Sequence, residues 1–271
     1  MSARALPILM YHHVSPSPGL VTMSPENFAA QMAWLADHGY HTMRCEDLAA
    51  FLGGAALPER AVMITFDDGY LDNYLFAYPI LKRHGLHAVL FGVTDWLGDG
   101  PARDIAETIV VSTPPNHREC QQLIAAGNAD QAIVRWSEVQ RMTADGTFEI
   151  QSHTASHTRW DKREADPTKK AASLEADLVR ARGALGERLG LQSDHLCWPQ
   201  GYFDADYLGV AARLGYRHLY TTRPGTATTA SDPALLPRIV VKDKGADWLA
   251  GRLRIYRSPL LARLYGLVRG H

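Results

Sequence analysis

Short apolar, β-branched runs alternate along this chain with stretches of helical periodicity. Strand-like runs cover residues 6–11, 61–66, 87–93 and 147–151, and segments with apolar residues at helical spacing separate them. Further runs extend the series at residues 41–44, 194–198, 216–221 and 235–241. This alternation indicates a mostly parallel sheet with helical crossovers. The sequence therefore predicts an α/β fold with seven or eight strands in its 271 residues, a length that α/β barrels often reach as one domain.

Residues 98–135 interrupt this alternation. They contain glycine and proline at the start, Pro114-Pro115 in the middle and helical stretches on either side. A long connection inside a compact domain is usually functional, so we expect an insertion that acts as a substrate-facing lid. We assign residues 1–245 to one folded domain with this insertion, and residues 246–271 to a basic amphipathic tail.

Two polar segments directly follow strand-like runs. Residues 65–70 read Thr-Phe-Asp-Asp-Gly-Tyr, and residues 152–157 read Ser-His-Thr-Ala-Ser-His. Loops at strand ends are where α/β enzymes place functional residues. One carboxylate and two imidazoles leave coordination positions of a hydrolytic metal open, and the second carboxylate is a spare general base. Either segment alone is weak evidence, because Asp-Asp-Gly is more often a turn and two of 12 histidines can fall four apart by chance.

These segments resemble the first two motifs of the polysaccharide deacetylases, carbohydrate esterase family 4 with the NodB homology domain. Residues 196–202, Leu-Cys-Trp-Pro-Gln-Gly-Tyr, resemble a degenerate third motif. Residues 7–14, Pro-Ile-Leu-Met-Tyr-His-His-Val, resemble the opening of the poly-β-1,6-N-acetylglucosamine deacetylase branch. The resemblance implies a distorted (β/α) barrel. It also implies a metal-dependent hydrolase that removes N-acetyl groups from an amino sugar in a polysaccharide or a lipid-linked glycan precursor.

The resemblance assigns roles to residues of the first two motifs. Asp68, His153 and His157 are expected to be the metal ligands, and Asp67 the base that takes a proton from water. Adjacent residues at a strand end point in different directions, so both carboxylates can act without competing. The expected cofactor is a divalent metal. We place zinc first, and this ligand set also admits nickel, cobalt or iron.

A general acid is required because an amine leaves poorly unless it is protonated. His12 corresponds to the catalytic histidine of the branch, and strand alternation sends the neighbouring His13 to the opposite face. Without the other motifs, His12 would be interpreted as a hydrogen-bonded core histidine. The other histidines, among them His117, have no partner spacing, and we interpret them as structural or surface residues.

The third motif departs from the family pattern. Gln200, in place of tyrosine, is expected to supply the backbone N–H that meets the oxyanion, and Tyr202 to replace the lost aromatic wall beside Pro199. A cysteine stands where many members carry an arginine that steers the catalytic aspartate. Arg238 lies in a segment that resembles the one through which this branch brings in an arginine. It either pairs with Asp67 and keeps it ionised or forms a purely structural salt bridge.

Two other functions fit the same residues. An amidohydrolase of a small cyclic amide or ureide is compatible with the fold, as is a non-catalytic sugar-binding module with a vestigial metal site. The intact set of ligands, base and acid argues against a module that only binds. An open groove would favour a sugar chain, and a closed pocket would favour a small amide.

Composition narrows the setting of the protein. The formal net charge of −1 gives no global field to attract nucleic acid. Three widely spaced cysteines argue against a disulfide framework and fit a reducing compartment. We recognise neither a signal peptide nor a membrane-spanning stretch of about 20 apolar residues. We therefore expect a cytoplasmic protein whose partner is an N-acetylated glycan.

Residues 248–269 differ in composition from the rest of the chain. They carry five arginines and no acidic residue, and Pro259 limits them to two short helices. A basic amphipathic stretch of this kind can lie on an anionic bilayer, which would put the protein at the inner membrane face. The alternative is a C-terminal helix packed on the barrel with its arginines solvated.

Overall fold

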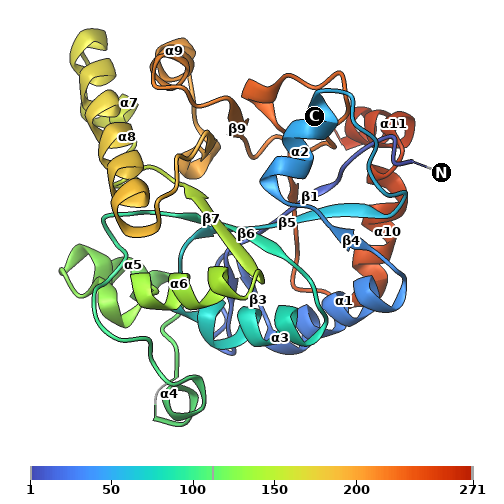
Figure 1. The fold of residues 1–271 in the computed structure, drawn as a ribbon, viewed down its shortest axis with the longest axis horizontal. Helices are drawn as coiled ribbons and strands as arrows, with labels where there is room; N and C mark the ends of the chain where they lie inside the picture. Colours follow the sequence, from blue (N-terminus) through green and yellow to red (C-terminus); the bar gives the residue numbers. More distant parts are fainter. Residues whose placement is uncertain (1, 112, 270–271) are drawn as a thin grey trace.

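A single curved sheet organises the chain. In the computed structural model, which describes residues 2–111 and 113–269, parallel strands follow the order β10-β1-β5-β6-β7-β8-β9, and β4 pairs with the beginning of β5 (Figure 1). These strands are β1 (Ile8–Tyr11), β4 (His41–Thr42), β5 (Ala61–Asp68), β6 (Ala88–Gly92), β7 (Phe148–Ser152), β8 (His195–Cys197), β9 (His218–Tyr220) and β10 (Ile239–Val240). Two short strands, β2 (His13–Val14) and β3 (Thr22–Met23), pair separately. The predicted α/β fold, a distorted (β/α) barrel, is confirmed.

The two edges of the sheet meet across a short contact. Leu236 forms a parallel bridge with Tyr220, at the end of β9, and makes backbone hydrogen bonds of 2.9 Å to both sides of it. The strand predicted for residues 235–241 is shorter than expected, because Pro237 has no N–H to donate and β10 begins after it. The segment before β10, which includes Arg238, therefore lies against β9.

Helices surround the sheet, with α1, α3 and α6 along one side of it (Figure 1). The helices are α1 (Pro25–Asp37), α2 (Cys45–Leu52), α3 (Tyr78–Arg83), α4 (Ile105–Val111), α5 (His117–Ala125), α6 (Trp136–Ala144), α7 (Trp160–Arg163), α8 (Pro167–Leu189), α9 (Ala205–Arg213), α10 (Ala246–Tyr256) and α11 (Pro259–Arg269). Ser24 caps α1 by accepting the N–H of Asn27, as its sequence predicts. Among the described helices, none combines the length and the apolar character that crossing a membrane requires.

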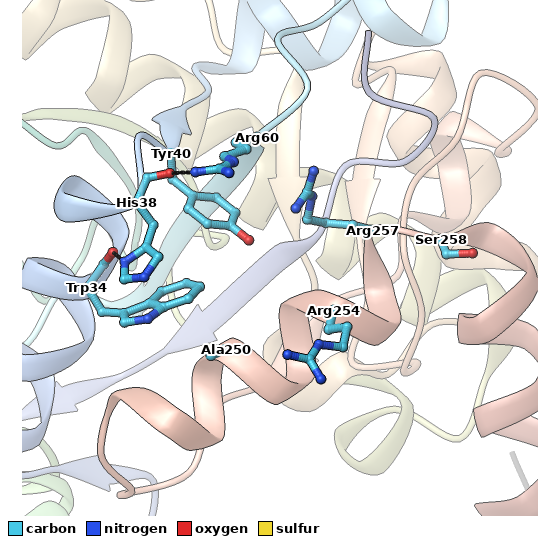
Figure 2. A pocket seen from close by; sticks show the side chains of 8 residues that line it. All are labelled: Trp34, His38, Tyr40, Arg60, Ala250, Arg254, Arg257 and Ser258. Carbon is cyan, nitrogen blue, oxygen red and sulfur yellow. Dashed lines mark hydrogen bonds between the residues drawn. The ribbon is translucent and has the colours of Figure 1, made fainter. Parts of the chain in front are cut away.

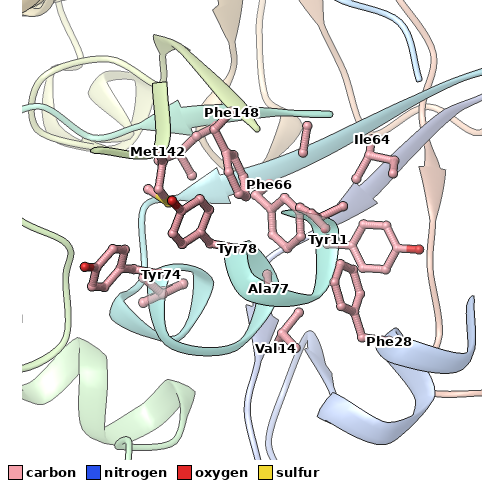
Figure 3. Packing of buried hydrophobic residues seen from close by; sticks show 14 of the residues in the cluster. Tyr11, Val14, Phe28, Ile64, Phe66, Tyr74, Ala77, Tyr78, Met142 and Phe148 are labelled. Carbon is pink, nitrogen blue, oxygen red and sulfur yellow. The ribbon is translucent and has the colours of Figure 1, made fainter. Parts of the chain in front are cut away.

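Strand alternation divides the core into two layers. Ile64 and Phe66 point outwards and pack with Phe28 of α1 in the larger cluster (Figure 3). Met63 belongs to a second cluster, which combines residues of β1, β5, β6, β8 and β9 with residues of α2. Because side chains two residues apart share a face of a strand, Asp67 lies on the same inner side as Met63. The core thus directs a carboxylate into the barrel at the end of β5.

Candidate active site

A pocket of about 390 Å³ opens where β5 ends. It is lined by His12, Leu20, Val21, Asp67, Asp68, His117, Gln121, His153, His157, Gln200, Gly201 and Thr222. Among the described residues, five other than glycine have a positive φ, and four of these line the pocket: Val21, Asp68, His157 and Gln200. Such backbone conformations are unfavourable and concentrate at functional sites, so they mark this pocket as the candidate site.

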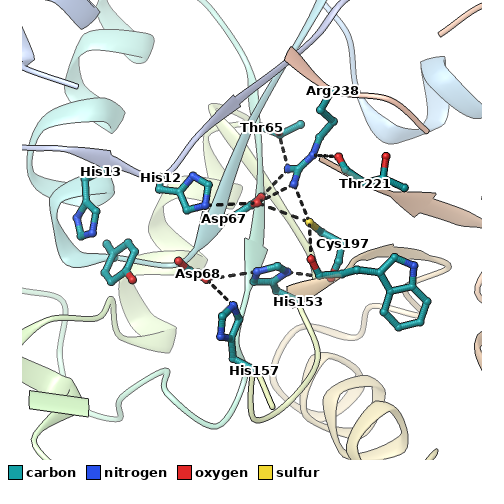
Figure 4. A network of polar contacts seen from close by, with 12 residues as sticks. His12, His13, Thr65, Asp67, Asp68, His153, His157, Cys197, Thr221 and Arg238 are labelled. Carbon is teal, nitrogen blue, oxygen red and sulfur yellow. Dashed lines mark hydrogen bonds and ion pairs between the residues drawn. The ribbon is translucent and has the colours of Figure 1, made fainter. Parts of the chain in front are cut away.

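Asp68, His153 and His157 bring three ligand atoms together (Figure 4). Nε2 of His153 and Nε2 of His157 each lie 3.3 Å from Oδ1 of Asp68. The N–H of His157 donates to Oγ1 of Thr154 at 3.0 Å, and this tight turn aims both rings at one point. The two polar segments that follow separate strands therefore converge, as their positions in the sequence predict.

The chemistry of these three donors fits a cation. Nδ1 of His153 donates to the carbonyl oxygen of Cys197 at 2.8 Å, since a carbonyl oxygen can only accept, and Nε2 is left facing Asp68. Burial lowers the pKa of His157 to about 4, so its ring is neutral near pH 7. Oδ1 of Asp68 is buried and has no hydrogen-bond partner among the described residues. A carboxylate and two imidazoles with their ligand atoms within 4.8 Å of one another match the donor set of a divalent metal.

Asp67 is held by a buried arginine that enters from beside β10. Nη1 and Nη2 of Arg238 donate to Oδ1 and Oδ2 of Asp67 at 2.7 Å each. Nε of Arg238 donates to the carbonyl oxygen of Thr221 at 3.0 Å, which fixes the guanidinium. Burial alone would raise the pKa of Asp67, but the charge and hydrogen bonds of Arg238 outweigh it and hold the pKa below its ordinary value. The carboxylate therefore stays ionised in one geometry.

Removing Arg238 should strongly destabilise the protein. In Arg238→Met, Asp67 becomes a buried charge without its partner, and breaking a buried pair in this way costs about 3–5 kcal/mol of unfolding free energy. Because Arg238 depresses the pKa of Asp67, the stabilisation is present above the ordinary aspartate pKa and is lost as pH falls through the depressed value. Urea unfolding should therefore show a large gap between variant and wild type at pH 7 that narrows in acid.

The double variant Asp67→Asn/Arg238→Met serves as the control for this measurement. It removes the unpaired charge and should recover part of the lost stability, because the two residues interact directly. An Arg238→Met protein as stable as wild type at pH 7 would contradict the account of the pair.

His12 and His13 lie on opposite sides of the chain, as alternation predicts. His12 lines the pocket, and its Nε2 lies 3.8 Å from Oδ2 of Asp67. Burial lowers the pKa of His12, although the nearby carboxylates oppose this shift. His13 points away from Asp67 and Asp68 (Figure 4). Its Nδ1 lies 2.6 Å from Oδ2 of Asp72, and its ring stacks on that of Tyr70.

The third motif reaches the pocket only in part. Gln200 lines it, with a φ of 56°. Pro199 and Tyr202 were predicted to bind substrate but are not among the lining residues. The ring of Tyr202 instead lies against the guanidinium of Arg159, 3.9 Å from the ring centroid. This cation–π contact holds the ring in place, so the structure does not show the predicted aromatic wall.

The pocket also contains groups that sequence spacing did not reveal. His117 and Gln121 of α5 line it, so part of the predicted insertion does face the pocket. Nδ1 of His117 lies 3.1 Å from Nε2 of His13, whose other ring nitrogen contacts Asp72. A chain of contacts thus leads from a buried carboxylate through two imidazoles to the pocket. His117 and His13 are 104 residues apart, so no local spacing could have revealed the pair.

Known proteins share sequence and fold with this chain. The polysaccharide deacetylase family profile matches residues 54–219, and the chain belongs to that family. The poly-β-1,6-N-acetyl-D-glucosamine N-deacetylase of Staphylococcus aureus is 22% identical over 233 residues, which cover 85% of this chain and 71% of the relative. The Bacillus subtilis protein YxkH is 28% identical over 237 residues, which cover 87% of this chain and 71% of the relative.

Solved structures share the fold. The deacetylase PplD of Streptococcus pyogenes, in complex with acetate, has a TM-score of 0.72 at 24% identity and covers 95% of this chain and 100% of its own. IcaB from Ammonifex degensii has a TM-score of 0.72 at 22% identity, covering 92% of this chain and 97% of its own. The predicted family membership and the predicted barrel are both confirmed.

Proposed function

We propose that this protein is a metal-dependent N-deacetylase that hydrolyses N-acetyl groups on an amino sugar of a polysaccharide or a lipid-linked glycan. The main support for this proposal is that one pocket contains both the possible metal ligands Asp68, His153 and His157 and the carboxylate of Asp67, which is paired with Arg238. Family membership supports the reaction class. The name of the Staphylococcus aureus relative supports an N-acetylated glycan as substrate.

Asp68, His153 and His157 would hold the metal. When bound, a divalent metal supplies Lewis acidity, which polarises a carbonyl group and lowers the pKa of water. Zinc is our first choice for this ligand set, with nickel, cobalt and iron as alternatives. The chain contributes the orientation of the donors, since the bond from Nδ1 of His153 to Cys197 fixes which nitrogen faces Asp68.

Asp67 and His12 form the proposed proton-transfer pair. Arg238 keeps Asp67 ionised, so its carboxylate can take a proton from the attacking water. His12, with Nε2 at 3.8 Å from that carboxylate, gives a proton to the leaving amine. We assign stabilisation of the oxyanion to the backbone N–H of Gln200. We assign a contact with the sugar to His117, whose ring is oriented by its contact with His13.

The two competing functions fit the site less well. A sugar-binding module has no use for an ionised, arginine-held carboxylate beside a histidine. A small cyclic amide fits best in a closed pocket. This pocket is open at its rim, where the lining residue Leu20 is 71% exposed. An open rim suits a chain that continues beyond the reacting sugar.

Removing one ligand should remove the metal. His153→Ala and Asp68→Ala are each expected to lower the metal affinity at least about tenfold. Loss of a residue that only hydrogen-bonds to a ligand already lowers metal affinity by about that much, and loss of the ligand itself should cost no less. Metal content after reconstitution and gel filtration, measured by mass spectrometry, checks this.

His195→Ala is the matched control for the metal measurement. His195 is a buried histidine in another group with ligand-type atoms, completed by Asp194 and His218. Its ring stacks on that of His218 with 4.3 Å between the ring centroids, and its Nδ1 lies 2.9 Å from the hydroxyl of Tyr220, so one of its two ring nitrogens already has a partner. Metal content that drops in His195→Ala while staying at the wild-type level in His153→Ala would refute the assignment.

A further inference from the structure

The two tail helices differ in how they meet the barrel. α10 buries Leu249 and Leu253 in the main core, so for this helix the alternative of a C-terminal helix packed on the barrel is correct. α11 packs inwards with Ala262 and Tyr265. The side chains of residues 268 and 269, which belong to the predicted membrane-binding stretch, lie outside the described residues.

α11 carries a stripe of exposed leucines. The exposed fractions are 66% for Leu260, 45% for Leu261, 51% for Leu264 and 67% for Leu267. At about 100° per residue, Leu260, Leu264 and Leu267 fall within about 60° of one another, and Leu261 widens the stripe to about 120°. A contiguous apolar face of this kind marks an interaction surface.

A basic hollow opens at the beginning of α11 (Figure 2). It has a volume of about 340 Å³ and is lined by Trp34, His38, Tyr40, Arg60, Ala250, Arg254, Arg257 and Ser258. Ser258 directly precedes α11 and accepts the N–H of Leu261 at 3.4 Å, so the positive end of the helix lies here too. Glu59 offsets Arg257, with 3.9 Å between their charged atoms, but the sequence contains no acidic residue after position 247.

The positive charge around α11 indicates which partner binds this surface. An apolar stripe beside clustered arginines matches an anionic bilayer, with leucines at the acyl boundary and guanidinium groups at the headgroup phosphates. A second copy of this chain could cover the leucines. A symmetric contact, however, would bring the arginines of both copies towards each other.

We propose that α11 and the hollow lined by Arg60, Arg254 and Arg257 form a docking surface for an anionic membrane. Thr222 lines both the catalytic pocket and a hollow bordered by Tyr265 of α11. The basic hollow lies at the beginning of β5, at the other end of that strand from the catalytic pocket, so α11 would hold the side of the barrel against the bilayer. Membrane binding itself does not depend on the proposed catalytic function.

Vesicle co-sedimentation of the full-length protein at low salt tests the proposal. The vesicles contain phosphatidylcholine alone or phosphatidylcholine with phosphatidylglycerol. Wild type should bind the anionic vesicles at least about tenfold better than the neutral ones. Leu260→Ser/Leu264→Ser/Leu267→Ser and Arg254→Gln/Arg257→Gln should each lose this binding. The three leucines and Arg254 are exposed and the Arg257 side chain is 28% exposed, whereas truncation at residue 245 would also remove Leu249 from the core.

Val110→Ser/Val179→Ser is the matched control. It removes two exposed apolar side chains, 84% and 52% exposed, from other helices and should bind as wild type does. Equal binding by wild type and the leucine variant would overturn the proposal. A wild-type dimer that becomes monomeric in the leucine variant, without vesicle binding, would overturn it in favour of a second copy. Inorganic phosphate bound by the wild type but not by the arginine variant, again without vesicle binding, would assign the hollow to soluble anions.

Discussion

Asp67→Asn should lower kcat for acetate release by about 10²–10⁴-fold, the contribution expected of a positioned general base. The amide keeps the shape of the carboxylate but cannot take a proton from water. Arg238 also loses its charge partner at 2.7 Å, so the stability of the variant must be measured alongside its activity. Metal content should stay at the wild-type level, because Asp67 is not one of the three proposed ligands.

The metal measurement separates the two neighbouring carboxylates. Ligand atoms of Asp67, His153 and Cys197 also lie within 4.8 Å of one another, so Asp67 has an alternative role as a ligand. If Asp67→Asn loses metal while Asp68→Asn keeps it, the proposed roles are reversed. Asp95→Asn, which alters an exposed carboxylate paired with Arg180, is the control and should retain full activity.

His12→Gln should also lower kcat by about 10²–10⁴-fold, with metal retained, because the leaving amine loses its proton donor. His13→Gln should cost less. His13 does not line the pocket and acts through His117, so we expect a change mainly in KM for the glycan. Steady-state kinetics of both variants on one N-acetylated oligosaccharide gives the comparison.

The pair of histidine variants is its own control, because both change a neighbouring imidazole on the same segment. An inactive His13→Gln together with an active His12→Gln would mean that the chain presents the other histidine to the reaction. The assignment of the acid would then be wrong even if the metal site is correct.

Local sequence patterns predicted much of the fold and the central residues of the site. Parallel strands bring their carboxyl ends to one edge, so Asp68 and His153 could be expected to meet although they lie on different strands. The period of two residues along a strand predicted that only one of His12 and His13 faces the site, and the resemblance to the family branch selected His12. The expected meeting of Asp68 and His153 needed no long-range information beyond the order of strands and helices.

Other features depended on contacts that no local pattern encodes. Arg238 reaches Asp67 across 171 residues, and its position was predicted only from the resemblance to a family branch. The last strand is shorter than the predicted range 235–241, because Pro237 lacks the N–H that a strand ladder needs. Tyr202 is drawn to Arg159, a residue outside every motif, and His117 gains its place from an insertion whose packing the sequence did not reveal.

Acetate release from N-acetylated glucosamine oligosaccharides is the decisive measurement for the proposed metal-dependent N-deacetylase. The protein would be stripped of metal, reconstituted with zinc, nickel, cobalt or iron, and assayed beside Asp67→Asn. We expect release by at least one reconstituted form, none by the stripped protein, and a loss of about 10²–10⁴-fold in the variant. Release at equal rates by stripped and reconstituted protein, or by wild type and Asp67→Asn, would contradict this proposal.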